Sequence, residues 1–333
     1  MHRRPLLATL VAAPLAAPAL IPAARAQSGG PSGGAVFDHA VRIVVPNAPG
    51  GTSDILARLI APELGRALGQ SVVVENRAGA AGNIGADAVA KSPPDGHALL
   101  LLDTAVLAIN PSLFPRMPFD LARDLAPVSM LIFAPYVLAV RNGLPVRDAA
   151  GLAAYARANP RGVNVANSGV GALNHLTAVE VAAHLNLTAV QVPYRGGAPA
   201  ITAVAGGEAD LIVNGATATL PFVTNGSMRG IAVSGDHRLA AAPDLPTFRE
   251  LGWPMADAGT WQGVLVQGGT PRPVIERLER ELRAVMAVPA IAARVADLGG
   301  EVRTDGAEAF RTWLARATEE YGRTVRTHGI RPE

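Results

Sequence analysis

Cysteine is absent from this sequence of 333 residues. Its absence excludes a disulfide framework, a cysteine-ligated metal and a thiol nucleophile, and also the lipid-carrying cysteine that anchors a bacterial lipoprotein. Lysine occurs only once, at Lys91, so Schiff-base chemistry has a single candidate. We expect a protein that holds no metal and no cofactor and that is not anchored to a membrane.

Charged and aromatic residues are also scarce, at 17% and 4% of the chain. This aliphatic composition, with many glycines and prolines, is typical of a globular protein rich in turns and not of a disordered one. Three of the 29 basic residues lie within the first 25 positions, and their removal leaves 26 against 27 acidic residues. The remaining chain lacks the basic excess on which nucleic-acid binding depends, so we expect no nucleic-acid partner.

The amino-terminal segment combines the three regions of a secretory signal peptide. Arg3 and Arg4 give it a basic start, residues 6–21 form an apolar run, and small residues follow. The run contains two prolines and is shorter than the roughly 20 residues of a membrane-spanning helix. We predict cleavage near Ala26 and export to the periplasm, by either the Sec or the twin-arginine route.

Short aliphatic runs alternate with amphipathic segments along the rest of the chain, which is typical of βαβ units and a largely parallel sheet. In the first expected helix, apolar residues recur at intervals of three and four until Gly69. The pattern predicts strands at residues 41–46, 71–75, 98–103, 136–140, 163–166, 189–192, 210–213 and 230–233, and helices at residues 53–68, 83–91, 173–185, 199–205, 273–286, 290–298 and 306–328.

We expect two α/β domains, each a mostly parallel sheet flanked by helices, with the chain crossing between them twice. Apolar stretches at residues 130–140 and 261–267 bracket the second series of strands. Two crossings allow a hinge, and hinged domains close around ligands. The predicted division is a signal peptide at residues 1–26, domain I at residues 27–137 and 255–333, and domain II at residues 138–254.

The loop before the first expected helix has the features of an anion-binding site. Gly50 and Gly51 turn the chain and the helix begins near Thr52. Free backbone N–H groups at a helix start, with the positive end of the helix dipole, can hold a carboxylate or phosphate without a cationic side chain. Alternatively, the glycines only turn the chain and a hydroxyl caps the helix. Asn47 and Ala48 of the same loop are further candidate ligand contacts.

A second segment with the same strand-loop-helix plan lies at residues 165–175. Asn167 and Ser168 supply polar side chains, and Gly169 permits close approach of a ligand. The glycine spacing is like the start of a dinucleotide fingerprint, but Asn174 stands at the third glycine position, so nucleotide binding is not expected. Two such loops facing one cleft would place two helix starts around an anion.

Further polar residues follow other expected strands. Tyr194 and Arg195 precede a glycine turn, and Arg195 either pairs with a ligand carboxylate or faces solvent. Thr104 and Asn214 follow aliphatic runs at the carboxyl ends of strands, the edge at which open α/β sheets bind ligands. The glycine-rich residues 75–85 form either another anion loop or a tightly packed turn.

Signatures of catalysis are missing from the sequence. It contains no Gly-x-Ser-x-Gly nucleophile elbow, no His-Glu-x-x-His zinc motif and no pair of histidines at ligand spacing on one helix. A general base at His175, with Asp54 or Asp210 as its partner, is the remaining catalytic hypothesis. A single histidine in a first helical turn is more often structural, and we expect no enzyme.

Short motifs in a fixed order run through nearly the whole mature chain. They are IVVP at 43–46, APGG at 48–51, DILAR at 54–58, VVVENR at 72–77, GNIG at 82–85, PDGH at 94–97, INPSL at 109–113, DLAPV at 124–128, VPYRG at 192–196, PDLPT at 243–247 and GGTP at 268–271. No single motif is decisive, but their joint order resembles that of the Bug-type receptors of tripartite tricarboxylate transporters, a class of periplasmic solute-binding protein.

The resemblance implies a two-domain Venus-flytrap fold that binds carboxylated solutes, such as di- and tricarboxylates, acidic amino acids or aromatic acids, and passes them to a membrane permease. It implies that the loops at residues 46–52 and 167–174 hold the ligand largely through backbone groups and ordered water. The chain departs from the family at Asn47, where an aromatic residue is common, and at residues 106–108, where small polar residues are usual. Both departures touch the presumed pocket, so the resemblance does not identify the ligand.

The leading hypothesis from the sequence is capture of one small organic carboxylate by domain closure, followed by delivery to permease subunits of a tripartite tricarboxylate transporter. A second hypothesis is a sensory adaptor whose closed form docks on a sensor kinase, and the third is the enzyme described above. In the leading hypothesis, backbone N–H groups of Gly50, Gly51 and Gly169 take the carboxylate, side chains of Asn167, Ser168, Asn174, Tyr194 and Asn214 orient the ligand, and Arg195 assists.

Overall fold

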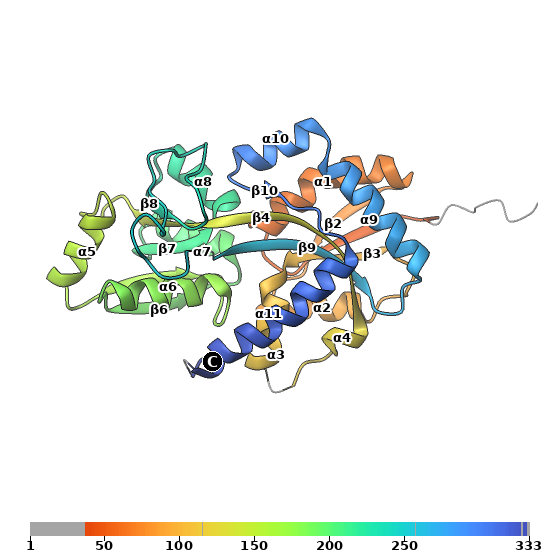
Figure 1. Cartoon of the computed structure of the whole chain (residues 1–333), viewed down its shortest axis with the longest axis horizontal. Helices are drawn as coiled ribbons and strands as arrows, with labels where there is room; N and C mark the ends of the chain where they lie inside the picture. The colour runs from red at the N-terminus through yellow and green to blue at the C-terminus, as the bar shows by residue number, and fades with distance from the viewer. Residues whose placement is uncertain (1–36, 115, 257, 328, 332–333) are drawn as a thin grey trace, which may run out of the picture. The chain divides into compact units, whose positions relative to one another are not determined.

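The computed structural model describes residues 37–114, 116–256, 258–327 and 329–331 (Figure 1). The predicted signal peptide at residues 1–26 lies outside the described residues. In the described part, no helix has both the length and the apolar character that crossing a lipid bilayer requires.

Ten strands in the described residues form one network of hydrogen-bonded neighbours. The main path has the order β2-β1-β3-β9-β4-β7-β5-β6, and β8 and β10 pair with β4 outside it. The pairs within β1–β3 and within β5–β7 are parallel, whereas every pair of β4 and β9 is antiparallel. The strands are β1 (Val41–Val45), β2 (Val72–Asn76), β3 (Ala98–Asp103), β4 (Leu125–Arg141), β5 (Val163–Asn167), β6 (Ala189–Pro193), β7 (Leu211–Gly215), β8 (Met228–Val233), β9 (Gly259–Gln267) and β10 (Glu301–Val302).

The 17-residue strand β4 joins two groups of strands, and it is the long yellow arrow in Figure 1. Its first part pairs with β9 as far as Pro135, which lies opposite Gly259. Its second part pairs with β7, beginning with Tyr136 opposite Gly215. The switch of partners separates a first strand group (β1, β2, β3 and β9) from a second strand group (β5, β6, β7 and β8).

Helices pack on both faces of each strand group. In the first group, Ile60 of α1 and Leu282 of α9 share one core, and Phe310 of α11 belongs to the core on the other face. In the second group, Leu176 of α6 and Ile201 of α7 belong to separate cores. The helices are α1 (Thr52–Leu68), the 3-10 turn η1 (Ala80–Gly82), α2 (Asn83–Ala90), α3 (Thr104–Leu113), α4 (Leu121–Asp124), α5 (Ala149–Ala158), α6 (Leu173–His184), α7 (Gly197–Gly206), α8 (Ala216–Thr224), α9 (Arg272–Met286), α10 (Pro289–Asp297) and α11 (Ala307–Thr327).

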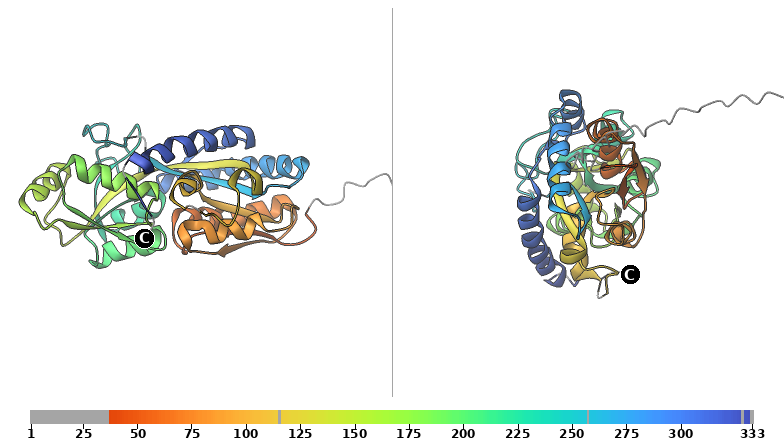
Figure 2. Two further views of the ribbon diagram at one scale, coloured as in Figure 1. Left: turned by 90° about the horizontal axis from the view of Figure 1, so that it is seen from below. Right: turned by 90° about the vertical axis from the view of Figure 1, so that its right-hand side faces the viewer.

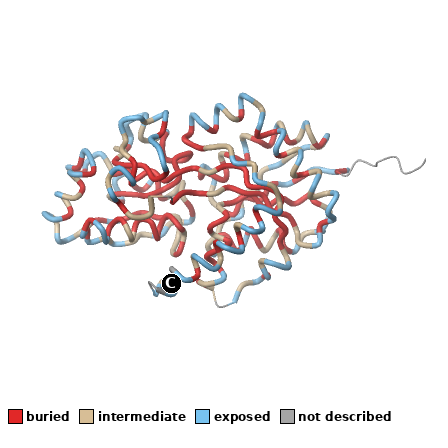
Figure 3. The backbone as a smooth tube through the Cα atoms, viewed as in Figure 1, coloured by how far each residue is buried: buried red, intermediate tan, exposed pale blue. Residues whose placement is uncertain are grey.

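The carboxy-terminal helices return to the amino-terminal strands, as the sequence predicts. Both α9 and α11 contact β4, and they are drawn in blue in Figure 2. Burial follows the same layers: the strands inside the sheet are almost continuously buried, the edge strands β2 and β6 are partly exposed, and the helices are exposed along one side (Figure 3).

The predicted alternation of strands and helices is confirmed, with small differences at the ends of elements. The helix expected at residues 53–68, for example, is observed at Thr52–Leu68. The strand expected at residues 136–140 is only the second part of β4. The sequence pattern missed α3, α4, α5 and α8. The helices α3 and α8 are apolar on most sides and contain Pro111 and Pro221, α4 has only four residues, and α5 consists largely of alanine.

Candidate ligand-binding site

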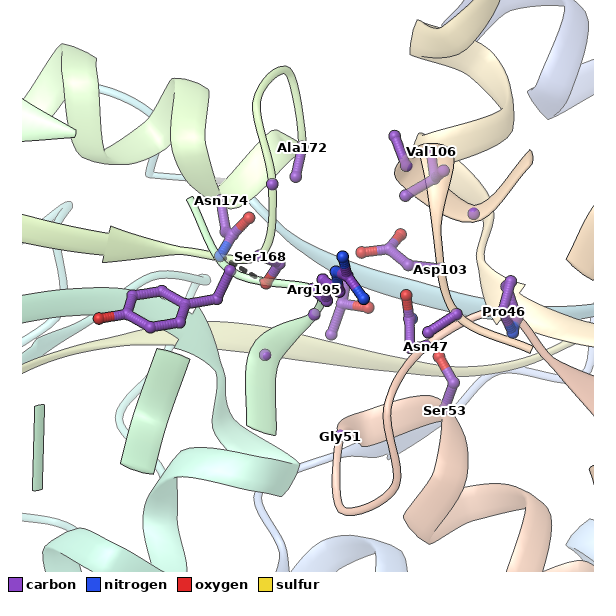
Figure 4. A pocket seen from close by; sticks show the side chains of 18 of the residues that line it. Pro46, Asn47, Gly51, Ser53, Asp103, Val106, Ser168, Ala172, Asn174 and Arg195 are labelled. Atoms are coloured by element: carbon purple, nitrogen blue, oxygen red, sulfur yellow. Dashed lines mark hydrogen bonds between the residues drawn. The ribbon is translucent and has the colours of Figure 1, made fainter. Parts of the chain in front are cut away.

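A cavity of about 560 Å³ opens where the carboxyl ends of the parallel strands from both strand groups face each other (Figure 4). Open α/β sheets bind ligands at this edge because loops and helix starts gather there. Antiparallel strands β4 and β9 close the cavity from one side through Tyr136 and Gln262. Its lining includes Pro46, Asn47, Gly51, Thr52, Ser53, residues 78–82, Ile84, Asp103, Val106, Asn110, Phe114, Tyr136, residues 168–172, Asn174, residues 193–197, Asn214, Gly215, Thr260 and Gln262.

Five helices begin at this cavity without a side-chain cap, and a sixth, α3, begins there with Asp103 as its cap. The uncapped helices have the N-cap residues Gly51 for α1, Gly82 for α2, Ala172 for α6, Gly196 for α7 and Gly215 for α8, and all five line the cavity. The first N–H groups of a helix have no partner within it, and the helix dipole makes this end electropositive. The convergence of five such ends on one cavity creates an environment that favours an anion.

The loop of residues 46–51 contacts the cavity through some of its predicted residues and not through others. Asn47, Gly51 and Thr52 line the cavity, but Ala48 and Gly50 do not. The N–H of Gly50 donates to Oδ2 of Asp54 at 2.8 Å. The prediction that Gly50 gives its N–H to a ligand carboxylate is therefore wrong for this structure, because the chain's own carboxylate already takes it.

Asp54 holds the start of α1 in place. Its side chain also accepts hydrogen bonds from Arg58 at 3.0 Å and from Nδ2 of Asn76 at 3.0 Å. Burial alone would raise the pKa of Asp54, but these hydrogen bonds and that of Gly50 outweigh burial and hold its pKa below the usual 3.8. Nδ2 of Asn76 also lies 3.1 Å from the carbonyl oxygen of Asn47. The loop is thus tied at both ends to a buried, ionised carboxylate.

The corresponding loop of the second group is organised in the same manner. Ser168, Gly169 and Asn174 line the cavity, whereas Asn167 is fully buried and does not. Oδ1 of Asn167 accepts the N–H of Gly169 at 3.0 Å. The predictions that Gly169 supplies a free N–H and that Asn167 touches the ligand are both contradicted, because the two residues satisfy each other inside the loop.

Three of the predicted polar residues form one network between β5, α6 and β7. Nδ2 of Asn174 donates to Oγ of Ser168 at 3.0 Å, which Figure 4 shows as a dashed line, and it lies 3.4 Å from Oδ1 of Asn214. Oγ of Ser168 lies 3.3 Å from the same oxygen of Asn214. Asn174 and Asn214 are almost completely buried. The network fixes the orientation of side chains that face the cavity.

Tyr194 and Arg195 line the cavity from the loop between β6 and α7. Arg195 is exposed and makes no ion pair with any acidic residue in the described part of the chain. The next residue, Gly196, has φ of +114°, and an added Cβ there would lie 3.5 Å from Cβ of Asn47. This loop therefore approaches the loop of the first group at a position that suits glycine.

Thr104 is not a cavity residue. It is completely buried, and its Cγ2 atom lies against Gly263 of β9. Asp103, one position earlier, lines the cavity instead. It is the last residue of β3, and its side chain caps α3 by accepting the N–H of Ala105 at 3.1 Å. A one-residue shift along a strand reverses the face to which a side chain points. The sequence located the correct strand end but the wrong residue.

Among the described residues that line the cavity, Asp103 is the single acidic residue. Burial raises its pKa to about 6, although hydrogen bonds from Thr260 and from the N–H groups of Ala105 and Trp261 act in the opposite direction. Beside it, Tyr136 is buried, and its pKa is raised by desolvation and by the charge of Asp103. In Figure 4 the Asp103 carboxylate extends into the cavity.

The sequence gave no signal for the part of the lining that comes from β9, and for the glycine-rich residues 75–85 it left an anion loop and a packed turn open; residues 78–82 of that segment line the cavity. Ala80 and Ala81 have φ of +46° and +49°, a conformation that costs a residue with a Cβ about 1 kcal/mol or more. The carbonyl of Ala81 accepts a hydrogen bond from Asn110, at 2.9 Å. The glycine-rich segment thus contributes strained backbone to the cavity, and it is not only a packed turn.

The structure contradicts the predicted acid–base pairs of His175. Its Nδ1 accepts the N–H of Gly171 at 3.1 Å, and burial lowers its pKa. Asp54 is committed to the start of α1, and Asp210 pairs with Arg141 at 2.7 Å. Neither carboxylate is available to orient the imidazole, so this histidine supports the loop.

A separate group of titratable side chains surrounds His97. Nε2 of His97 lies 3.5 Å from Asp38, Nδ1 lies 3.2 Å from Asp95, and the ring stacks on His39 with planes 6° apart. Nitrogen lone pairs lie in the plane of an imidazole ring, so two stacked rings do not aim at one point between them. We assign no metal site to this group.

The sequence matches the profile of the "Tripartite tricarboxylate transporter family receptor" over residues 56–330. The chain belongs to this family. It is 35% identical over 283 residues to the UPF0065 protein in the tcbD–tcbE intergenic region of a Pseudomonas species, with 85% of this chain and 84% of that protein covered. It is 33% identical to BugT of Bordetella pertussis, with 87% and 90% covered.

Solved structures of this receptor type superpose well on the chain. Periplasmic binding protein BugD gives a TM-score of 0.84 at 31% identity, covering 89% of this chain and 100% of BugD. R. palustris Rpa4515 with adipate gives 0.84 at 31%, covering 89% and 99%. MatC of Rhodopseudomonas palustris with bound malate gives 0.80 at 28%, covering 87% and 100%. The receptor therefore has the two-domain α/β fold of periplasmic binding proteins, and it is a solute-binding protein and not an enzyme.

Proposed function

We propose that this receptor captures a small organic carboxylate in the cavity between the two strand groups and delivers it to the permease subunits of a tripartite tricarboxylate transporter. The observation that carries the proposal is the convergence of five uncapped helix starts on one cavity. The adipate and malate named with two of the solved relatives support the ligand class. Arg195, which forms no ion pair within the described residues, adds a cation to the cavity lining.

We propose further that capture proceeds by closure of two domains, residues 27–137 with 255–333 and residues 138–254. Support comes from β4, which changes partners between Pro135 and Tyr136, close to the first proposed boundary. The second boundary lies just before β9 begins at Gly259. The loop of residues 46–51 and the loop between β6 and α7, which we call the two cavity loops, approach each other at Asn47 and Gly196. Opening of the two domains would separate these loops.

The signal peptide at residues 1–26 would bring the receptor to the periplasm, the compartment of its family. Mass spectrometry of the protein recovered from the periplasm tests this step, with an amino terminus near Gln27 as the expected result. An intact amino terminus would contradict it.

Calorimetric titration of the protein that begins at Gln27 tests the binding proposal. We expect saturable binding of at least one acid from a panel of succinate, malate, adipate, aspartate and citrate. The absence of binding by every acid of a chemically diverse panel would contradict the proposal.

A pair of variants at Gly51 tests the role of the helix start. Gly51 has φ of −79°, which proline can adopt, so Gly51→Pro removes one N–H with little change of the backbone. Gly51→Ala keeps the N–H, and its Cβ would lie 3.8 Å from the nearest atom, the carbonyl oxygen of Ala48. Because a hydrogen bond to a charged group contributes about 1.5–3 kcal/mol, we expect at least tenfold weaker binding for the proline variant only. Thermal unfolding of both proteins checks their fold.

A further inference from the structure

The cavity has a second chemical character besides its helix starts. At the ends of β3 and β9, hydrogen-bond acceptors gather: the carboxylate of Asp103 and Oε1 of Gln262. Gln262 is only 1% exposed, and this oxygen has no hydrogen-bond partner in the described part of the protein. Nε2 of Gln262 is already used, because it donates to Oγ1 of Thr260. The side-chain oxygen of Gln262 is therefore buried without a hydrogen-bond donor from the described residues.

Asp103 has no cationic partner that would account for its position. Its side chain forms no ion pair within the described residues, and Arg195, the basic residue of the lining, is exposed and unpaired. Capping of α3 does not require a charge, since Asn, Ser or Thr caps a helix as well. An ionised carboxylate in a cavity that otherwise favours anions is costly unless a positive group accompanies it.

We propose that Asp103 and Gln262 form a subsite for an ammonium group of the ligand, so that the bound solute is an organic acid that also carries an amino group. The inference rests on the proposed function, because the helix starts would hold the carboxylate of the same molecule. An ammonium group has three N–H donors and a positive charge. It satisfies the free oxygen of Gln262 and neutralises Asp103 at once, whereas a hydroxyl supplies one donor and no charge.

The groups that face Asp103 set the expected pH dependence. Tyr136 of β4 is buried and Tyr321 of α11 is partly buried near it, and the charge of Asp103 acts on both. Arg195 shares the cavity from the loop after β6. Burial raises the pKa of Asp103 to about 6 in the empty site, and an adjacent ammonium group would lower it. Binding of an amino acid therefore releases a proton near pH 6, and its affinity falls as the pH falls below 6.

Matched acids and an isosteric variant test the subsite. Succinate, malate and aspartate share one dicarboxylate skeleton and carry hydrogen, hydroxyl and ammonium at the same carbon, and adipate and 2-aminoadipate form a second pair. Calorimetry would compare the wild-type receptor with Asp103→Asn, which retains a capping side chain. Asp120→Asn is the matched control, because Asp120 caps α4 in the same manner at an exposed position outside the cavity.

We expect the wild type to prefer the amino member of at least one series by tenfold or more, and Asp103→Asn to abolish or reverse that preference while Asp120→Asn retains it. The ratio of wild-type to Asp103→Asn affinity for the amino acid should also decline between pH 7.5 and pH 5. Tighter binding of the plain dicarboxylate in each series, or an unchanged preference in Asp103→Asn, would overturn this subsite and leave the proposed function standing. Failure of every acid to bind would overturn both.

Discussion

Asp103 illustrates how a single residue can be unfavourable for folding and useful for binding. Its folded-state pKa of about 6 lies above the usual value for aspartate, near 3.9. A raised folded-state pKa means that the native state binds the proton more tightly than the unfolded chain. The tighter binding of this proton stabilises the folded protein fully below pH 4, and this stabilisation is lost as the pH rises through 6.

We therefore expect Asp103→Asn to be more stable than the wild type at pH 7.5, by an amount on the order of 2 kcal/mol. The difference should shrink towards zero at pH 3.5, where the carboxyl group is neutral in the native state and largely neutral in the unfolded chain. Urea unfolding of both proteins at the two pH values measures it. Equal stability at pH 7.5 would show that solvent reaches the carboxylate and that its burial costs little.

Gly196 matters through the space it leaves between the two cavity loops. In Gly196→Ala the added Cβ would approach Asn47 in a backbone conformation with φ of +114°. Gly207→Ala is the matched control, because Gly207 also has positive φ, +85°, and its added Cβ meets no atom within 4 Å. Gly207→Ala should lose about 1 kcal/mol of stability, and Gly196→Ala should lose more, about 1–3 kcal/mol, because φ of 114° with ψ of 174° is a conformation that essentially only glycine adopts. Thermal unfolding measures both losses.

Only Gly196→Ala should also weaken ligand binding, since only it lies between the loops that face the ligand. Calorimetry with whichever acid the wild type binds would separate the two effects. If Gly207→Ala weakened binding to the same degree, general loss of stability would be the explanation and not the contact between the loops.

At the scale of an element, the start of α1 depends on one buried carboxylate. Asp54→Ala removes the acceptor of Gly50, Arg58 and Asn76 together. Because these donors would be left without their partner, we expect a loss of about 2–4 kcal/mol at pH 7 and weaker ligand binding as the loop loosens. The folded-state pKa of Asp54 is lowered, so its contribution is present above pH 4 and disappears as the pH falls further.

Glu319→Ala serves as the comparison for Asp54→Ala. Glu319 pairs with Arg323 on α11 in a fully solvated position, where ion pairs contribute well under 1 kcal/mol. Denaturant unfolding at pH 7 should distinguish the two variants clearly. Similar small losses would mean that the loop holds its shape without Asp54.

The elements of the fold were largely predictable, because strand and helix periodicities are local properties of the sequence. The helix starts at Thr52 and Leu173 follow from glycine turns that precede apolar repeats. The cavity lining was less predictable, because it depends on which N–H groups the loops use for themselves. Gly50 and Gly169 look free in the sequence, yet Asp54 and Asn167 accept their hydrogen bonds.

Contacts made by antiparallel strands could not be predicted at all from local patterns. Gln262 and Thr260 reach the cavity because β9 pairs with β3 and β4, whose residues lie more than a hundred positions earlier. Asp103 was passed over for its neighbour because the residue at which a strand ends decides which side chain faces forward. The residue at which a strand ends is decided by its pairing with other strands in the folded protein and not by the intrinsic β-propensity of the residues.

At the scale of the whole molecule, the absence of cysteine offers a direct test of domain closure. An added Cβ at Gly50 would lie 3.4 Å from Cβ of Ala198, close to the range for a disulfide. In the double variant Gly50→Cys/Ala198→Cys, the two new thiols have no competitor in the sequence. Oxidation should lock the two cavity loops together.

We expect the oxidised, ligand-free double variant to bind ligand at least tenfold more slowly than the reduced one, and the variant oxidised with ligand present to release it more slowly. Stopped-flow fluorescence with and without dithiothreitol measures both rates, and the two single variants serve as controls. Unchanged rates in the disulfide-linked protein would show that ligand exchange does not require these loops to separate.

The five uncapped helix starts also bear on how such a receptor can change its ligand over evolutionary time. A backbone N–H is present whatever side chain occupies the position, unless proline replaces it, so mutation does not readily erase the electropositive floor of the cavity. Substitutions at a few surrounding positions, such as Asp103 and Gln262, can then alter what the rest of the ligand must look like. Under the proposed function, anion recognition is therefore retained with the fold, and single substitutions around the helix starts can change which acid is bound.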